Sequence, residues 1–412
     1  MRSTTEAVKI EEDANVPAEK PNIPAGYELK QQLRNPSMGK RTIVVFSVSA
    51  GTGHVRAAEA LAATARATFP DLEVVHFDLM TLVPPLFREL YAGSYQPLVE
   101  RHPALWGYLY DLSDRPRRES HPDHLRVAVE RLNTQKLKQL VRDVQPDAVI
   151  CTHFLPAELF SRWRRKGSFT RPVWVVVTDF DVHRLWVHSH LSGYCTAAEE
   201  VAWRLQDRGV DPGSVHVTGI PIMPAFAKKL SRKACATEIG LDPRKPTLLI
   251  MAGGAGLGGI LKMVRRLLEI RENIQVVALA GKNARMLAEL QKVSRDHRGR
   301  LFPLGFTSTI ERIMKTADLA ITKSGGLTTS ECLSMGLPMV VVMPIPGQEE
   351  RNADFLLEHG AALKAFDETG LEFRIRVLLN DRRRLRVMSR NARRLGRPDA
   401  ATDILNLVLK SV

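Results

Sequence analysis

One stretch in the C-terminal half of the chain carries groups suited to binding a nucleotide sugar. The apolar run at 318–322 predicts a buried strand, and Gly325 and Gly326 predict a turn at positive φ before a helix that opens at Leu327. Free backbone N–H groups and the positive end of the helix dipole meet at such a helix start, which suits a diphosphate. Glu331, one to two turns into the helix, could accept hydrogen bonds from a ribose diol.

Polar residues also follow the next strand, which is predicted at 339–343 and ends at Pro344. Polar side chains that follow a strand in this way could form hydrogen bonds with the hydroxyls of a sugar. The two strand-to-helix turns together predict half of a nucleotide-sugar site. The donor-binding residues expected in this half are Ser324, Gly325, Gly326, Leu327, Thr328, Glu331, Pro346, Gly347, Gln348, Glu349 and Asn352.

A histidine begins a helix near the start of the chain. The run at 41–47 predicts a buried strand, and a glycine turn that includes Gly53 leads into an alanine-rich helix. This turn is not a Walker loop, because His54 stands where that loop needs lysine. A histidine beside glycines that admit a substrate can accept a proton from an alcohol, and a helix-capping role is the alternative.

A second group of ionisable side chains follows the strand predicted at 172–177. Ligands of open α/β sheets bind at the carboxyl ends of strands, so Asp179, His183 and Trp186 are candidates for a substrate site. His183 and His188 could begin a metal site, but no third ligand follows at a suitable spacing. We therefore predict metal-independent chemistry.

A glycine-rich loop at 253–259 follows another predicted strand, and Gly254 and Gly256 would let the backbone approach a phosphate. A dinucleotide-binding fold is the alternative. That fold wants an acid at the end of the next strand, and the strand at 274–280 ends in Gly281-Lys282-Asn283 instead. The loop is therefore better suited to a UDP-sugar than to NAD.

Aromatic residues gather at 82–110 among prolines and cations, as in a segment that meets a membrane interface. Tyr95 and Trp106 are the candidate membrane or acceptor contacts there. Packing of a helical subdomain is the alternative, and the sequence does not separate the two.

Composition limits the classes of protein that fit. The 412 residues carry a net charge of +14, with 44% hydrophobic and 25% charged residues, which is ordinary for two globular domains. No apolar run reaches the ~20 residues that span a bilayer, and no secretory signal opens the chain. The four cysteines are far apart and predict reduced core residues. The charge suits an anionic membrane surface, since no nucleic-acid module is recognisable, although a solvated basic face remains the alternative.

Three motifs in this sequence resemble glycosyltransferase family 28, in particular its monogalactosyldiacylglycerol synthases and processive diacylglycerol glucosyltransferases. They are SxxxGxGH ending at His54, TDxDxHxxW at 178–186, and the Gly-Gly, Glu, Pro-Gly-Gln-Glu and Asn series already described. The resemblance covers about residues 40 to 400. It implies the α/β GT-B fold, with two Rossmann-like domains facing an interdomain cleft. The implied parts are an acceptor domain at 39–222, a donor domain at 247–397 and a C-terminal helix at 398–412 that returns toward the first domain. Composition, rather than the resemblance, predicts a disordered leader at 1–38 and a linker at 223–246.

The same resemblance implies an inverting transfer of glucose or galactose from a UDP-sugar to diacylglycerol. His54 would be the base, Asp179 could polarise it, His183 would face the acceptor, Trp186 could meet lipid, and Phe306 would contact the uracil. UDP-hexose is the co-substrate and no cofactor is expected. The enzyme would be cytoplasmic and bound peripherally to anionic lipids on the inner face of the cell membrane. Glucose versus galactose and the oligomeric state stay open. The alternatives are transfer of N-acetylglucosamine to a polyprenyl-linked peptidoglycan precursor, and a non-catalytic membrane-surface protein.

Overall fold

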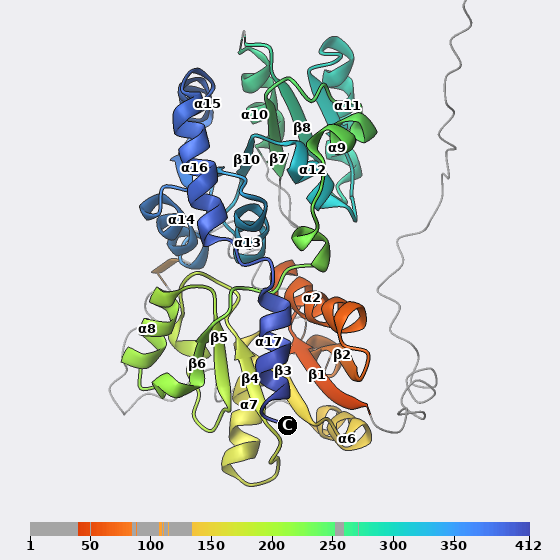
Figure 1. Cartoon of the computed structure of the whole chain (residues 1–412), viewed down its shortest axis with the longest axis vertical. Helices are drawn as coiled ribbons and strands as arrows, with labels where there is room; N and C mark the ends of the chain where they lie inside the picture. The colour runs from red at the N-terminus through yellow and green to blue at the C-terminus, as the bar shows by residue number, and fades with distance from the viewer. Residues whose placement is uncertain are drawn as a thin grey trace, which may run out of the picture. The chain divides into compact units, whose positions relative to one another are not determined.

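Two parallel β-sheets organise the chain (Figure 1). The computed structural model describes residues 40–49, 51–84, 88, 107–108, 110, 114, 134–251, 259–270 and 272–412. Each sheet has six strands, in the orders β2-β1-β3-β4-β5-β6 and β12-β11-β10-β7-β8-β9. The predicted α/β class with two Rossmann-like domains is confirmed.

The N-terminal domain is built on the first sheet. Its strands are β1 (Arg41–Ser47), β2 (Leu72–Asp78), β3 (Ala148–Cys151), β4 (Val173–Val176), β5 (Gly193–Thr196) and β6 (Val215–Val217). Its helices include α2 (Thr52–Thr68), α6 (Gln135–Val144), α7 (Phe154–Arg165), the 3₁₀ turn η2 (Arg184–Trp186) and α8 (Glu199–Asp207). Strands β3, β4 and β5 are buried along their whole length, as expected when helices cover both faces of a parallel sheet.

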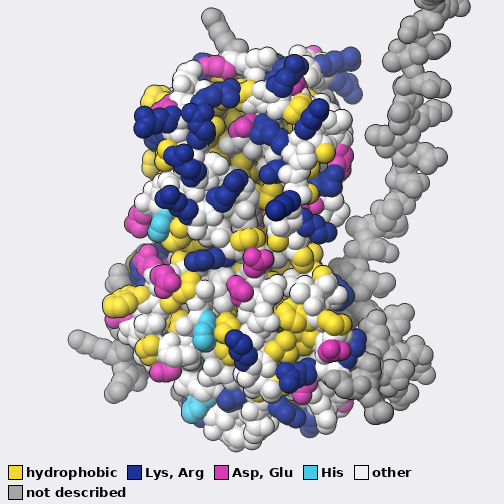
Figure 2. All heavy atoms as spheres, in the orientation of Figure 1, with side chains coloured by type: hydrophobic (Ala, Val, Ile, Leu, Met, Phe, Trp, Pro, Cys, Tyr) yellow, Lys and Arg dark blue, Asp and Glu magenta, His cyan; other side chains and the backbone are white. Residues whose placement is uncertain are grey.

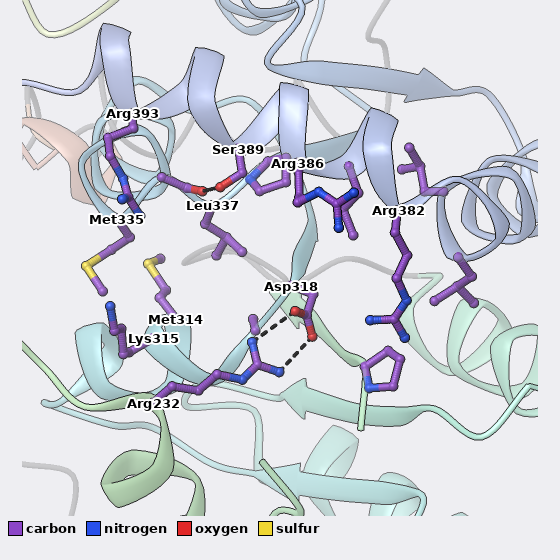
Figure 3. Close-up of a pocket in the computed structure, with 17 residues that line it drawn as sticks. Arg232, Met314, Lys315, Asp318, Met335, Leu337, Arg382, Arg386, Ser389 and Arg393 are labelled. Carbon is purple, nitrogen blue, oxygen red and sulfur yellow. Dashed lines mark hydrogen bonds and ion pairs between the residues drawn. The ribbon is translucent and has the colours of Figure 1, made fainter. Parts of the chain in front are cut away.

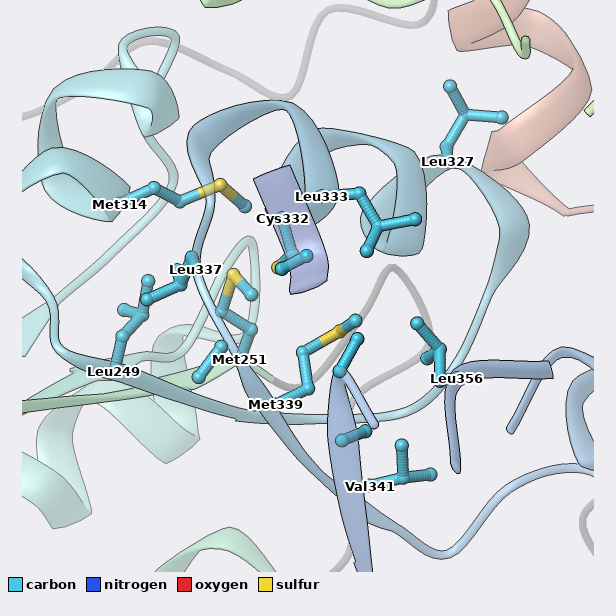
Figure 4. Close-up of a cluster of buried hydrophobic side chains, with 14 of the residues drawn as sticks. Leu249, Met251, Met314, Leu327, Cys332, Leu333, Leu337, Met339, Val341 and Leu356 are labelled. Carbon is cyan, nitrogen blue, oxygen red and sulfur yellow. The ribbon is translucent and has the colours of Figure 1, made fainter. Parts of the chain in front are cut away.

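The C-terminal domain repeats this plan. Its strands are β7 (Thr247–Met251), β8 (Gln275–Leu279), β9 (Leu301–Leu304), β10 (Leu319–Thr322), β11 (Met339–Val342) and β12 (Ala362–Ala365). Its helices include α10 (Ile260–Leu268), α11 (Ala284–Asp296), α12 (Ile310–Thr316), α13 (Gly326–Met335), α14 (Gln348–Glu358), α15 (Glu368–Asn380) and α16 (Arg382–Leu395). Side chains of α13 pack with those of β7 and β11 in a buried cluster that includes Met251, Cys332 and Met339 (Figure 4).

Strands β5, β6, β9 and β12 were not predicted as strands. β12 was not anticipated, and Cys195 and Thr196 of β5 were assigned to the opening of a helix. Strand β5 was not predicted because it begins with Gly193, and glycine has a low intrinsic propensity for strands. In the sheet it lies directly against the Trp174 ring, where a Cβ would collide with the ring. Packing against a neighbouring strand, rather than local propensity, therefore makes this segment a strand.

Segments between and after the domains pack closely. Helix α9 (Arg232–Ile239) lies inside the predicted linker, and its Cys235 and Ala236 are buried in the core. Helix α17 (Ala400–Leu409) packs against the first sheet, where Ile404 and Leu405 join the cluster that contains Ile43. All four cysteines are unpaired and buried, which agrees with the predicted core role. No helix in the described ranges has the combined length and apolar character that crossing a bilayer requires.

Candidate active site

His54 lies in the first turn of α2 with its imidazole orientation set by the N-terminal domain. Its Nδ1 is 2.8 Å from the backbone oxygen of Thr152 and 2.9 Å from Oγ1 of Thr178. A carbonyl oxygen can only accept, so Nδ1 carries the hydrogen and Nε2 is left as an acceptor. Burial lowers the pKa of His54 from 6.5 to about 4, so the ring is neutral near pH 7. The start of α2 has no side-chain cap, so the structure does not support the capping alternative.

Aromatic side chains surround this imidazole. The ring of His153 lies 4.6 Å from that of His54 in an edge-on arrangement, and Trp186 lies 6.1 Å away. Trp186 is only 4% exposed, so the expectation that it meets lipid directly is wrong in this structure. The side chain instead packs beside the two imidazoles and helps to exclude water from them. His153 caps α7 by accepting a hydrogen bond from the backbone of Leu155.

The side chain of His183 is held by hydrogen bonds within the protein and does not face an open site. Its Nδ1 accepts a hydrogen bond from the backbone N–H of Leu185 at 3.1 Å, so its Nε2 carries the hydrogen and donates to the backbone oxygen of Tyr110 at 3.1 Å. The side chain is buried, and the desolvation lowers its pKa. The prediction that His183 faces the acceptor is therefore corrected, because both ring nitrogens already serve the protein.

The N-terminus of α13 has the open backbone groups that a diphosphate needs. Gly325 is its N-cap residue, no side chain caps the helix, and the first helical hydrogen bond runs from Thr329 N to Gly325 O. The N–H groups of Gly326, Leu327 and Thr328 therefore precede the hydrogen-bonded part of the helix. This arrangement matches the predicted anion site.

The reason for the two glycines differs from the one predicted. Gly325 has φ −61°, and Gly326 is not among the residues with positive φ, so the predicted positive-φ turn is wrong. A Cβ at Gly326 would overlap the backbone oxygen of Thr178 and lie 3.2 Å from Oδ1 of Asp179. Glycine is needed here because the two domains meet at this point.

Close packing also brings His54 near the donor half of the site. A Cβ at Gly53 would lie 3.6 Å from Cδ2 of Leu327, so the N-termini of α2 and α13 face one another. Thr178, which contacts the imidazole of His54, also contacts Gly326. The candidate base and the candidate phosphate site thus share one location, although they are far apart in sequence.

Glu331 lies one turn further along α13 and is buried. Burial raises its pKa from 4.5 to about 7, while the positive charge of Arg56 on α2 acts in the opposite direction. Within the described ranges its carboxyl group makes no hydrogen bond. Its role as an acceptor for a ribose diol stays a prediction.

Asn352 joins the two domains instead of facing a sugar. Its Oδ1 accepts from the backbone N–H of Phe180 at 2.7 Å, and its Nδ2 donates to Oδ1 of Asp179 at 3.0 Å and to the backbone oxygen of Ser324 at 2.9 Å. The residue is fully buried, so its predicted contact with the hexose is wrong in this structure.

The same contacts correct the catalytic role that was predicted for Asp179. Its carboxyl group bonds to Asn352, and among the described residues no hydrogen bond connects it to His54. Burial raises its pKa to about 6. Thr152 and Thr178 therefore orient the imidazole, and the prediction that Asp179 polarises it is wrong in this structure.

The loop before α14 completes this half of the site. Ser324 is buried and its hydroxyl donates to the backbone oxygen of Glu349 at 2.6 Å. Oε2 of Glu349 accepts from the backbone N–H of Ile345 at 2.7 Å, and its Oε1 would lie 3.6 Å from a Cβ at Gly325, beside the start of α13. Pro346 and Gly347 precede Gln348, the first residue of α14, and Gly347 adopts φ +86°. Glu349 is thus the best placed of these polar side chains to meet a sugar.

Phe306 follows β9 and is 69% exposed, with Nζ of Lys282 5.2 Å from its ring centre. An exposed aromatic ring at this edge of the sheet is available to stack on a base. Four predicted contacts, Gly254, Gly256, Tyr95 and Trp106, lie outside the described residues.

The domains also share an ionic contact that was not predicted from the sequence. Arg351 on α14 donates to Oδ2 of Asp181 at 2.5 Å and lies 5.5 Å from the Tyr110 ring. Arg351 directly precedes Asn352 in the sequence, and this position beside a predicted site residue was the only sequence feature that could have suggested its role. The described residues contain no group of three or more His, Cys, Asp or Glu that could hold a metal ion.

Comparison with known proteins agrees with this geometry. Residues 54–222 match the family model described as monogalactosyldiacylglycerol (MGDG) synthase, and residues 247–404 match the glycosyltransferase family 28 C-terminal domain. The processive diacylglycerol beta-glucosyltransferase of Bacillus licheniformis is 33% identical over 68% of this chain and 73% of the relative. The protein of the same name from Bacillus cereus is 27% identical over 92% of this chain and 94% of the relative.

Solved structures share the fold. MurG from Acinetobacter baumannii superimposes with a TM-score of 0.56 at 16% identity, covering 90% of this chain and 99% of that one. MnaA from S. aureus, solved with UDP, gives a TM-score of 0.61 at 16% identity, covering 90% and 98%. These likenesses support the GT-B arrangement of the two domains. The two matched family models and the bacterial relatives show that the chain belongs to the monogalactosyldiacylglycerol synthase and processive diacylglycerol glucosyltransferase group of glycosyltransferase family 28.

Proposed function

We propose that this protein transfers a hexose from a UDP-sugar to the free hydroxyl of 1,2-diacylglycerol, with inversion at the anomeric carbon, to make a membrane glycolipid. The relatives carry the name of diacylglycerol beta-glucosyltransferases. A β-linked product is what one inverting displacement gives from an α-linked UDP-sugar.

The single observation that carries the proposal is the apposition of α2 and α13. It places a neutral imidazole, with Nε2 able to accept a proton, beside a helix N-terminus with open N–H groups. A proton acceptor and an anion site in one location are the two groups that glycosyl transfer from a nucleotide diphosphate requires.

In the proposed reaction the hydroxyl oxygen of diacylglycerol attacks the anomeric carbon while His54 Nε2 takes its proton. The bond between that carbon and the β-phosphate oxygen breaks, and UDP leaves with the bonding electrons. The N–H groups at Gly326, Leu327 and Thr328 would stabilise the charge on the departing diphosphate. Glu331 would hold the ribose and Phe306 the uracil, and Gln348 and Glu349 would orient the hexose.

The direct test is to incubate the protein with UDP-glucose, UDP-galactose or UDP-N-acetylglucosamine and vesicles that contain diacylglycerol, and to detect glycolipid by mass spectrometry. We expect hexosyl-diacylglycerol, and a chelator should leave the rate unchanged if transfer is metal-independent. No glycolipid with any donor would refute the proposal. Transfer from UDP-N-acetylglucosamine to a polyprenyl-linked peptidoglycan precursor alone would favour the alternative enzyme.

Replacing His54 by alanine tests the role of the base. Loss of a general base costs about 10²–10⁴-fold in rate, whereas binding of UDP should persist because the donor groups lie on α13. Because the pKa of His54 is lowered to about 4, the unaltered enzyme should keep its activity as the pH falls through 6.5 and lose it only nearer to 4. Turnover by His54→Ala at the unaltered rate would show that another group accepts the proton.

We also propose that the protein acts at the cytoplasmic face of the membrane as a peripheral enzyme. The substrate itself is a membrane lipid, the net charge is +14, and Tyr108, within the aromatic segment at 82–110, is 62% exposed. Sedimentation with anionic vesicles tests this placement, and binding should weaken as salt screens the charge. Equal binding to neutral and anionic vesicles would argue against a role for the basic residues.

A further inference from the structure

A pocket of about 390 Å³ lies in the C-terminal domain at the opposite end of α13 from the candidate diphosphate site. It opens between the C-termini of α12 and α13 and one face of α16 (Figure 3). Since α13 has ten residues and rises about 1.5 Å per residue, its two ends lie roughly 15 Å apart. The pocket is therefore separate from the site already described.

The pocket wall is strongly basic. Arg382 and Arg386 are one helical turn apart and extend from the same face of α16, and Lys315 on α12 lies toward the other end of the pocket, near Met335 (Figure 3). Asp318 is the acid among the described residues that line the pocket, and Arg232 pairs with it through hydrogen bonds of 2.9 and 2.8 Å. Within the described ranges no ion pair neutralises Lys315, Arg382 or Arg386. This face of the molecule is rich in Lys and Arg over α15 and α16 (Figure 2).

Two other lining residues have structural roles. Ser389 donates to the backbone oxygen of Gly336 at 2.7 Å, which holds α16 against the C-terminal cap of α13. Arg393 also packs on Gly336, where its charge suits the negative end of the helix dipole. Lys315, Arg382 and Arg386 are the cations left for a ligand.

We propose that this pocket is a second anion site, which binds a molecule with a phosphate group. Guanidinium groups match phosphate oxygens through paired hydrogen bonds, and a concave wall with three unneutralised cations favours an anion over a neutral molecule. The apolar part of the wall, formed by Met314, Leu337 and Leu378, would accept the carbon portion of a phosphate ester. The volume is in the range of small-ligand pockets. This inference does not depend on the proposed transferase activity.

Matched double variants on α16 provide the test. Arg382→Ala with Arg386→Ala removes two charges from the pocket, whereas Arg383→Ala with Arg390→Ala removes two charges from exposed positions of the same helix that do not line it. Inorganic phosphate is titrated into the full-length protein by calorimetry in the presence of excess UDP, so that the donor site is occupied. We expect affinity to fall at least about tenfold in the pocket variant and less than about twofold in the control.

A second arm separates a lipid headgroup from a soluble ester. Vesicles of phosphatidylcholine with phosphatidic acid are compared with soluble glycerol 3-phosphate, using the same two variants. Selective loss of vesicle binding would assign the pocket to a lipid headgroup, and selective loss of binding to the soluble ester would assign it to a free metabolite. If neither phosphate, glycerol 3-phosphate nor vesicles lose affinity selectively in the pocket variant, the proposal is overturned. Melting temperatures near that of the unaltered protein confirm that both variants fold.

Discussion

Replacing Glu331 by glutamine should stabilise the protein while weakening its binding of UDP. The carboxyl group is buried in α13, and burial raises its pKa from 4.5 to about 7. Above pH 7 the folded protein must hold this group ionised in a poorly solvated position. Glutamine has nearly the same shape and carries no charge, so it removes that cost.

The stabilisation should depend on pH in a defined direction. As the pH rises from about 4.5 to about 7, the unfolded chain has already lost the Glu331 proton and the folded chain retains it, so the free energy of unfolding falls. At about 1.4 kcal/mol per pKa unit, the shift from 4.5 to about 7 corresponds to about 3 kcal/mol. The variant should therefore match the unaltered protein near pH 4.5 and exceed it by about 2 to 3 kcal/mol at pH 8.

Urea unfolding at several pH values measures this difference in the free energy of unfolding. Because a two-domain protein need not unfold in one step, hydrogen exchange of the α13 amides measures the stability of the C-terminal domain separately. Glu358→Gln, at an exposed position on α14, is the matched control and should change little. UDP affinity of Glu331→Gln should fall about tenfold, because a charged acceptor for the ribose diol is lost. Equal stability of Glu331→Gln and the unaltered protein at pH 8 would refute the argument that burial destabilises this carboxylate.

Three other substitutions test the contact between the domains and the base site. Gly326→Ala should lower activity at least about 100-fold, because the added Cβ would overlap the backbone oxygen of Thr178. Gly325→Ala should keep most activity, because the nearest atom to its added Cβ is 3.6 Å away. Equal losses of activity in the two variants would contradict this reasoning. Asn352→Ala leaves three buried partners without their hydrogen bonds and should destabilise the protein by about 2 to 4 kcal/mol in urea unfolding; a change below about 0.5 kcal/mol would contradict it. Phe306→Ala should weaken UDP binding by about 1 to 3 kcal/mol in calorimetry if the exposed ring stacks on the base, and unchanged affinity would place the uracil elsewhere.

Local pattern was sufficient to predict much of the fold. Buried parallel strands are continuous apolar runs, and for this reason β1 was predicted with its observed bounds. Strand β5 was missed because Gly193 has low strand propensity and becomes part of the sheet only through its contact with Trp174. A helix start was predicted at Leu327, one residue after the observed start at Gly326, because a turn after a strand is a local event.

Individual roles in the site were harder to predict, because burial and hydrogen-bond partners are properties of the whole molecule. Asn352 and Glu349 are close in sequence and both polar. Asn352 is fully buried and joins the two domains by hydrogen bonds, whereas Glu349 has a carboxylate oxygen beside the start of α13. His183 and His54 both follow a strand, yet both nitrogens of the first are occupied by the protein. Residue type and spacing could not separate these pairs.

The sequence by itself determined the succession of strands and helices, the glycine-lined helix starts and the family, since all of these depend on residues that are close along the chain. Only the tertiary structure decided that α2 meets α13, that threonines rather than an aspartate orient His54, and that Gly326 is needed for contact between domains. These features depend on atoms that are 98 or more residues apart in the chain, and their distances are set by how the two sheets and their helices pack.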